Sequence, residues 1–188
     1  IDIVPVTTYF QEGYHLVDER HVSSRVNGRT RAILFCNPSN PTGAVYTPGE
    51  IELIARVAFQ HDLFIISDEV HREFLYDGTR YLSPLSIKSV QKRVIVADSI
   101  SCRFSSCGAR IGFLVTMNDK VIRAVNRFSM ARLAVPTIDQ RLAEKAFEMD
   151  PSYVGGLAAE YRARRDALVE ELGKGQDLAF RKPDGAFY

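Results

Sequence analysis

Four short apolar segments recur along the chain, and each has the length of a strand. They are RAILFC (31–36), LFIIS (63–67), RVIVA (93–97) and IGFLVT (111–116). Short apolar runs bounded by turn residues are typical of buried strands. Between the first two lies a capping box, Thr47-Pro48-Gly49-Glu50, which starts a helix by satisfying its first free N–H groups. A strand, a helix and a second strand in this order predict a mainly parallel sheet covered by helices.

The second half of the chain has a helical pattern. We expect helices over about 118–133, 137–149 and 152–173, and a further strand opening at 178–182. Asp150-Pro151 marks a modest boundary, because proline suits the first turn of a new helix. The last helix carries three arginines close to acidic residues, and we expect a solvated face with i,i+4 pairs rather than a nucleic-acid patch. The residues concerned are Glu160, Arg162, Arg164, Arg165 and Asp166.

Charge and cysteine content narrow the class of protein. There are 24 basic and 23 acidic residues, so the net charge of +1 argues against non-specific binding to nucleic acid or an anionic membrane. No apolar run reaches the roughly 20 residues that span a bilayer. The three scattered cysteines fit a reducing compartment, and we expect a cytoplasmic protein. The first residues, IDIVPVTTYF, have neither an initiator Met nor the features of a signal peptide, so we expect a processed chain or a piece of a longer one.

Polar segments stand next to each predicted strand. NPSNPTG (37–43), DEVH (68–71) and DSISCR (98–103) follow the first three strands, and GARIG (108–112) leads into the fourth. Ligands of open α/β sheets bind beyond the carboxyl ends of the strands, so these segments are expected to face one crevice. Arg110 and the serines suit a phosphate, and Asp68 suits a buried cationic nitrogen.

Taken in order, NPSNPTG, SDEVHREF, DSISCRFSSCGARIG and KPDGAFY resemble the signature of class I and II aminotransferases, which are fold-type I enzymes that use pyridoxal 5′-phosphate (PLP). The resemblance covers the whole chain and is strongest to bacterial aspartate-aminotransferase-like members. It implies an α/β fold: residues 1–150 would form the central part of the large PLP-binding domain. Residues 151–188 would form a connecting helix and the start of a small α+β C-terminal domain. Family chains are longer at both ends and form homodimers, and their substrates are amino acids and 2-oxo acids.

The resemblance also implies roles for individual residues. Asn40 would donate a hydrogen bond to the phenolic oxygen of PLP, and His71, where many members have Tyr, would also reach that oxygen. Asp68 would pair with the pyridine nitrogen and keep it protonated, which makes the ring an electron sink. Ser99 and Ser101 would lie beside the phosphate. Arg110, eight residues beyond position 102, would clamp it.

Cys102 departs from the family pattern. The resemblance implies that this position, between Ser101 and Arg103, holds the catalytic Lys that forms a Schiff base with PLP and then moves the proton. A thiol cannot form an imine, so we expect aminotransferase activity to be impaired or absent in this chain. Three readings of Cys102 stay open: a small buried thiol in the place of the lysine, a replacement that traps a ligand complex, and a natural pseudoenzyme. Two other functions also stay open, a non-catalytic PLP-fold ligand-binding or regulatory module and, because of His71, a PLP-dependent carbon–sulfur lyase.

Structural explanations compete with each functional one. Asn40 suits a turn, Asp68 suits a helix cap, and Arg110 with the serines suits an exposed loop. Taken together in one ordered set of motifs, the cofactor roles are favoured. A metal site from His61, Asp68 and His71 matches no common ligand spacing, and no metal is predicted. A disulfide between Cys102 and Cys107 is not expected.

Overall fold

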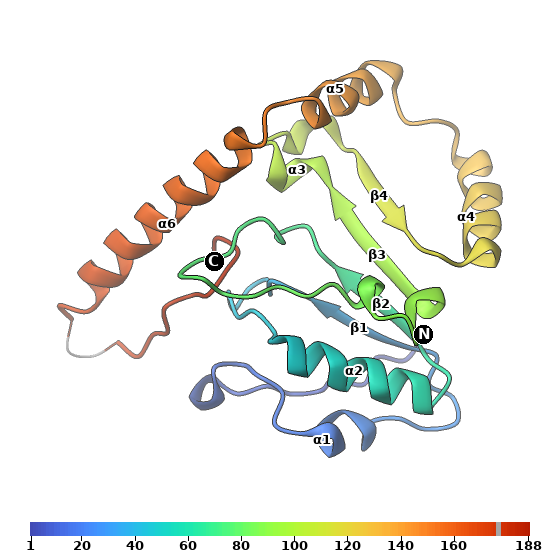
Figure 1. Ribbon diagram of the computed structural model, residues 1–188, viewed down its shortest axis with the longest axis horizontal. Helices are drawn as coiled ribbons and strands as arrows, with labels where there is room; N and C mark the ends of the chain where they lie inside the picture. The colour runs from blue at the N-terminus through green and yellow to red at the C-terminus, as the bar shows by residue number, and fades with distance from the viewer. Residues whose placement is uncertain (176–177) are drawn as a thin grey trace.

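The computed structural model describes residues 1–175 and 178–188, and a four-stranded sheet lies at its centre (Figure 1). The strands stand side by side in chain order: β1 (Ala32–Cys36), β2 (Phe64–Asp68), β3 (Val94–Ser99) and β4 (Gly112–Val115). β1, β2 and β3 are parallel, and β4 is antiparallel to β3. Each strand overlaps one of the four apolar segments, and the prediction of a mainly parallel sheet is confirmed.

The crossover between β1 and β2 is the helix α2 (Pro48–Gln60), and its capping box forms as predicted. Thr47 Oγ1 accepts a hydrogen bond from the Glu50 N–H, and Glu50 Oε2 accepts one from the Thr47 N–H over 2.7 Å. The apolar face of α2 packs on β2 and β3 and forms the main hydrophobic core. Its fully buried members are Ile51, Ile54, Ala55, Ala58, Leu63, Ile65, Val90, Val94 and Val96.

Of the remaining helices, short ones precede β1 or lie between the strands, and the longer ones follow β4. Short helices are η1 (Phe10–Glu12), α1 (Glu19–Ser23), η2 (Pro84–Ser86), η3 (Gln91–Arg93), α3 (Ile100–Arg103) and η4 (Cys107–Ala109). The longer α4 (Asp119–Arg132), α5 (Thr137–Phe147) and α6 (Ser152–Leu172) confirm the three helices predicted in the second half. α4 and α5 lie beyond β4, and α6 leads away from α3 before the chain returns to the sheet (Figure 1). None of the helices in the described ranges is long and apolar enough to cross a membrane.

The strand expected at 178–182 was a wrong prediction. The segment forms no strand with any described part of the chain, and Leu178 is exposed. It approaches the N-terminal part of the chain instead, where Arg181 Nη1 donates to the Phe10 carbonyl over 3.4 Å. A strand requires a neighbouring strand to pair with its backbone. The apolar residues of segment 178–182 do not themselves supply that partner.

The prediction that the α6 arginines form a solvated face is right for Arg164 and wrong for Arg165. Arg164 Nε donates to Glu160 Oε1 over 2.8 Å on the exposed side of the helix. The Arg165 side chain is only 6% exposed and bonds to Asp77 Oδ2 and to the Pro183 carbonyl. α6 therefore holds the C-terminal segment against the rest of the molecule through a buried guanidinium.

One face of the sheet is much less covered than the face beneath α2. Leu34, in the middle of β1, is 71% exposed, and β4 has no buried residue. Parallel sheets are normally covered on both faces. α4 likewise buries no residue and exposes Phe128 and Met130.

Candidate functional site

The strand register brings the predicted site segments to one edge of the sheet. Cys36 and Asp68, the last residues of β1 and β2, are partners across the sheet. Asp68 is also the partner of Ala97 in β3, and Ser99 is the partner of Gly112 in β4. The polar segments after β1, β2 and β3 and the one before β4 therefore all start from the same edge, as the sequence predicted.

The C-terminal segment returns to this edge and lies against the NPSNPTG turn (Figure 1). The Gly43 carbonyl accepts hydrogen bonds from the N–H groups of Asp184 and Gly185, and the Ala186 N–H donates to the Phe74 carbonyl. Gly43 has a φ of +67°, and a Cβ atom on Gly185 would lie 2.8 Å from the Phe74 carbonyl oxygen. Both glycines are therefore required for this close approach.

The returning segment places Tyr188 beside Asn40. Asn40 Nδ2 donates a hydrogen bond to the Tyr188 hydroxyl over 3.0 Å. Burial raises the pKa of Tyr188, and the neighbouring acidic groups Cys102, Cys36 and Asp68 raise it further. Tyr188, which was not predicted as a site residue, therefore lies among those that were.

His71 lies on the same side of the sheet and is 2% exposed. Its ring makes edge contacts with the rings of Phe187 and Tyr188, at centroid distances of 4.8 and 5.3 Å. Burial lowers the pKa of His71, and Asp68 only partly opposes this shift. His71 is thus a neutral imidazole at neutral pH, and its buried Nδ1 has no hydrogen-bond partner among the described residues.

Asp68 is half-buried, and within residues 1–175 and 178–188 its side chain accepts a single hydrogen bond. Its Oδ1 accepts from the Val70 N–H over 3.2 Å, which turns the chain away from β2. Its negative charge acts on Cys36, His71, Cys102 and Tyr188 at once. The carboxylate therefore lies close enough to affect the pKa of all four side chains.

Cys102 occupies the short helix α3 directly after β3 and is half-buried. Burial raises its pKa, and so do the nearby Cys107, Asp68 and Asp98. Burial likewise raises the pKa of Cys36 to about 11. Both groups are therefore thiols rather than thiolates at neutral pH, and a thiol is a weak nucleophile.

The predicted phosphate-binding residues lie on the turn that follows β3. Ser99 Oγ caps α3 by accepting from the Ser101 N–H over 3.2 Å. Cys107 Sγ donates to the Ser101 carbonyl, and Arg110 Nη1 donates to the Cys107 carbonyl over 3.0 Å. Arg110 is exposed and sits in a left-handed conformation with a φ of 54° just before β4. The loop after α3 thus folds back on Ser101 and carries Arg110 with it.

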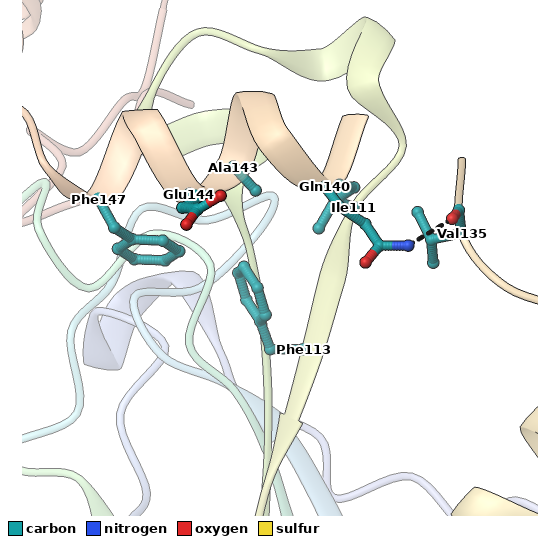
Figure 2. Close-up of a pocket in the computed structure, with 7 residues that line it drawn as sticks. All are labelled: Ile111, Phe113, Val135, Gln140, Ala143, Glu144 and Phe147. Atoms are coloured by element: carbon teal, nitrogen blue, oxygen red, sulfur yellow. Dashed lines mark hydrogen bonds between the residues drawn. The ribbon is translucent and has the colours of Figure 1, made fainter. Parts of the chain in front are cut away.

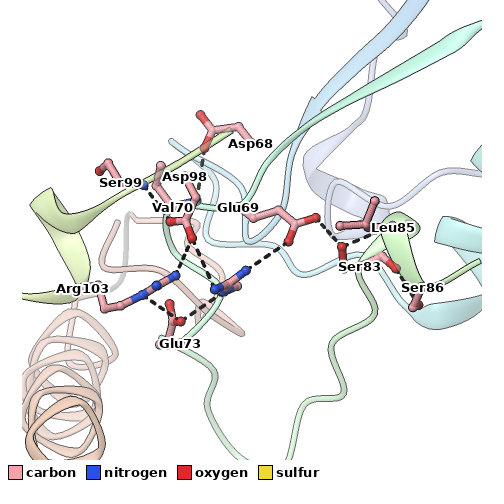
Figure 3. Close-up of polar contacts among 11 residues, drawn as sticks. Asp68, Glu69, Val70, Glu73, Ser83, Leu85, Ser86, Asp98, Ser99 and Arg103 are labelled. Carbon is pink, nitrogen blue, oxygen red and sulfur yellow. Dashed lines mark hydrogen bonds and ion pairs between the residues drawn. The ribbon is translucent and has the colours of Figure 1, made fainter. Parts of the chain in front are cut away.

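A cluster of five charged residues lies behind this edge: Glu69, Arg72, Glu73, Asp98 and Arg103 (Figure 3). Asp98 Oδ2 is 2.5 Å from Arg103 Nη2 and 3.3 Å from Arg72 Nη2. Glu69 Oε1 accepts from Ser83 Oγ over 2.7 Å. We call these five residues the acid–arginine cluster.

Two features lie outside the site. A cavity of about 420 Å³ between β4 and α5 is lined mainly by apolar residues, among them Phe113 and Phe147 (Figure 2). None of the predicted site residues lines it. His61 stands at the end of α2, before β2, whereas His71 follows β2, so the two histidines are separated by the length of that strand.

Tyr188, Cys36 and the acid–arginine cluster were missed by reading the sequence. KPDGAFY was recognised as a motif, but the contact between Asn40 and Tyr188 joins residues 148 positions apart. Arg103 entered the sequence analysis only as the neighbour of position 102. The available signal was that all five charged residues lie within the motifs SDEVHREF and DSISCRFSSCGARIG.

Comparison with known proteins identifies the family. The model of the family described as aminotransferase class I and II matches residues 1–188. Aromatic-amino-acid aminotransferase 2 of Thermococcus litoralis is 38% identical over 98% of this chain and 48% of its own length. A probable aspartate/prephenate aminotransferase of Aquifex aeolicus is 35% identical over 95% of this chain and 46% of its own.

Solved structures agree. The crystal structure of an aromatic aminotransferase from Pyrococcus horikoshii OT3 matches with a TM-score of 0.88 at 32% identity, over 97% of this chain and 49% of that one. The chain spans about half the length of the relatives that it matches. It belongs to the class I and II aminotransferase family, whose α/β fold it shares and whose cofactor is pyridoxal 5′-phosphate.

Proposed function

We propose that this chain is the cofactor-binding part of a PLP-dependent aminotransferase that moves an amino group from an amino acid to a 2-oxo acid. The observation that supports this most is the convergence of Asp68, His71 and Asn40 at one sheet edge, next to a turn bearing hydroxyls and Arg110. A buried imidazole nitrogen without a partner among the described residues fits a polar ligand there. PLP, when bound, supplies an electron-withdrawing ring.

Each residue has a distinct proposed task. The Asp68 carboxylate holds a proton on the pyridine nitrogen by a charge-assisted hydrogen bond. Asn40 donates to the phenolic oxygen, and the neutral His71 donates to it from whichever ring nitrogen carries the proton. Ser99, Ser101 and Arg110 would bind the phosphate, with the guanidinium group of Arg110 supplying the positive charge.

Cys102 decides how active the chain is. This position carries a protonated thiol. A thiol cannot form an imine with an aldehyde as an amine does, and in its protonated form it cannot act as a general base. A missing general base typically costs about 10²–10⁴-fold in rate. We therefore propose that the chain binds PLP and is nearly inactive, which favours a non-catalytic PLP-fold ligand-binding module as the second candidate function.

The arrangement of the whole protein is part of the proposal. Residues 1–150 would be the central part of the large PLP-binding domain, and 151–188 the connecting helix and the start of the small C-terminal domain. A homodimer in the cytoplasm completes it, and the three free thiols are compatible with a reducing compartment.

Binding of PLP tests the proposal. Equilibrium dialysis of the native chain against PLP should show one site, and Asp68→Asn should weaken its affinity by about 10–100-fold, because a hydrogen bond to a charged group contributes about 1.5–3 kcal/mol. Asp119→Asn is the matched control, since Asp119 is an exposed carboxylate in the first turn of α4. Equal affinities of the native chain and Asp68→Asn would contradict the assignment.

Turnover separates the two candidate functions. With an amino acid and a 2-oxo acid as substrates, the native chain should be nearly inactive in a full-length context, and Cys102→Lys should raise its rate. A native protein that turns over as fast as Cys102→Lys would show that Cys102 does not limit catalysis.

A further inference from the structure

The acid–arginine cluster joins the two halves of the candidate site. Glu69, Arg72 and Glu73 follow β2 and interleave with His71, whereas Asp98 and Arg103 bracket the turn that carries Cys102. Contacts between the halves run both ways (Figure 3). Arg103 reaches back to Glu73, with Nε 2.9 Å from Oε1, and Arg72 reaches forward to Asp98.

Asp98 contacts both arginines of the cluster and the backbone of the turn. One carboxylate oxygen, Oδ2, receives both guanidinium groups, from Arg103 and from Arg72. The other oxygen, Oδ1, accepts the Ser99 N–H over 2.7 Å. Asp98 therefore fixes the backbone at the start of α3, the turn that presents Ser99, Ser101 and Cys102.

The cluster is buried where its geometry matters. The side chains of Asp98 and Arg103 are 5% and 7% exposed, and that of Glu69 is 1% exposed. Buried ion pairs often stabilise a fold no better than apolar side chains of the same size, because removing both charges from water is costly. Unlike an apolar contact, such a cluster fixes the relative positions of its side chains, because its contacts are directional.

We propose that the acid–arginine cluster is a positioning device that sets where Cys102, Ser99 and Ser101 lie relative to Asp68 and His71. Arg103 is the key positioning residue: its side chain donates a hydrogen bond to Asp98, forms an ion pair with Glu73 and lies over the Phe147 ring. Its neighbour Cys102 lies on the same short helix, α3. The effect on PLP rests on the proposed function, but the effect on Cys102 does not.

The test uses the Cys102 thiol as a reporter in the absence of PLP. Iodoacetamide labelling, resolved by peptide mass spectrometry, gives separate rates for Cys102, Cys107 and Cys36. Arg103→Lys keeps the charge but cannot bond to Asp98 and Glu73 together. It should speed labelling of Cys102 by about threefold or more relative to Cys36, because α3 opens more often. Glu144→Gln, in an exposed pair on α5, is the control and should change nothing.

A second variant keeps the test decisive if Arg103→Lys fails to fold. Glu73→Gln keeps the shape of the native side chain, which is 24% exposed. Because the new side chain has no charge, it should weaken the ion pairs that Glu73 makes with Arg72 and Arg103. Folded variants, verified by circular dichroism, that label Cys102 at the native rate would overturn the positioning role.

Dialysis against PLP then distinguishes this inference from the proposed function. The same variants should bind PLP about tenfold more weakly than the native chain. This is a typical loss of affinity when a residue that orients the binding residues, without touching the ligand itself, is changed. If the native chain binds no PLP, the proposed function is wrong, while the labelling rates still confirm or overturn the positioning role. If both folded variants bind PLP as tightly as the native chain, the cluster does not affect cofactor binding, and that part of the inference is wrong.

Discussion

Asn40 and Tyr188 are separated by 148 positions in the sequence, yet the Asn40 side-chain amide donates a hydrogen bond to the Tyr188 hydroxyl over 3.0 Å. The contact joins the NPSNPTG turn to the C-terminal segment. The same two segments are also joined by the two backbone hydrogen bonds that the Gly43 carbonyl accepts. Tyr188 also contacts His71. The residue proposed to bind the phenolic oxygen is therefore oriented by a segment from the far end of the chain.

Removing the Tyr188 hydroxyl tests that relationship. Tyr188→Phe leaves the ring against His71 and takes away the partner of Asn40. A neutral hydrogen bond contributes about 0.5–1.5 kcal/mol, so PLP should bind roughly 2–10-fold more weakly when Asn40 is no longer oriented. Equilibrium dialysis measures this, and Tyr9→Phe, at an exposed ring, is the control. Tighter binding by Tyr188→Phe would mean that the hydroxyl competes with the cofactor instead.

The buried Arg165 should be required for docking of the C-terminal segment. Arg165→Leu removes the donor of the Pro183 carbonyl, whereas the 42% exposed Asp77 keeps its ion pairs with Arg162 and Lys182. The loss should therefore come mainly from the Pro183 carbonyl and the packing of the guanidinium, about 1–3 kcal/mol of unfolding free energy. Urea unfolding measures it. Arg164→Leu, which breaks only the exposed pair with Glu160, should cost less than about 0.5 kcal/mol, and equal losses would contradict the account.

The two faces of the sheet should differ sharply in their response to truncation. Ile65, in the middle of β2, is fully buried beneath α2, and Ile65→Ala should lower the unfolding free energy by about 2–5 kcal/mol. Leu34, in the adjacent strand, is 71% exposed, and Leu34→Ala should change it by less than about 0.5 kcal/mol. Thermal or urea unfolding of the chain measures both. Similar losses would show that the open face is covered in solution.

Glu50 should make stability depend on pH in the acidic range. Burial alone raises the pKa of Glu50, but hydrogen bonds from Thr47 and from the Leu16 N–H outweigh burial, with help from His15, and the pKa is lowered. A group whose pKa is lower in the folded state stabilises it above the unfolded pKa of about 4.3, and this contribution is lost as the pH falls through the folded value.

Glu50→Gln isolates that effect. At pH 7 the variant should be less stable than the native chain by about 1 kcal/mol, the typical difference between hydrogen bonds to a charged and to a neutral acceptor. The difference should shrink as the pH falls below about 4.3, because Glu50 is then protonated first in the unfolded chain and, at a lower pH, in the folded chain as well. Urea unfolding at pH 7, 5 and 3.5 measures it. A difference that stays constant over this range would show that the charge of Glu50 plays no part.

Elements of the fold could be predicted because their signals are local. The apolar runs of β1 to β4 and the Thr47–Glu50 capping box each lie within a few residues, and the structure confirms them. The antiparallel direction of β4 was not predicted, since an apolar run has the same pattern in either direction. The wrong strand at 178–182 has the same cause, because a strand depends on a neighbour that the segment itself does not encode.

Long-range contacts limited what could be predicted of the site. The motifs placed Asp68, His71 and Cys102 beside strand ends, and the sheet register brings those ends together. The burial of Arg165, by contrast, depends on Asp77 and Pro183, which are 88 and 18 positions away. No periodicity within α6 distinguishes Arg165 from the exposed Arg164.

Covalent capture of PLP at position 102 tests the central claim most directly. An amine at this position should condense with the aldehyde of PLP, and borohydride then reduces the product to a stable secondary amine that peptide mass spectrometry can locate. The account predicts that Cys102→Lys is labelled at residue 102, that labelling falls when Asp68→Asn is added, and that the native chain is not labelled there. Labelling of Cys102→Lys only at surface lysines, with residue 102 unmodified, would contradict it.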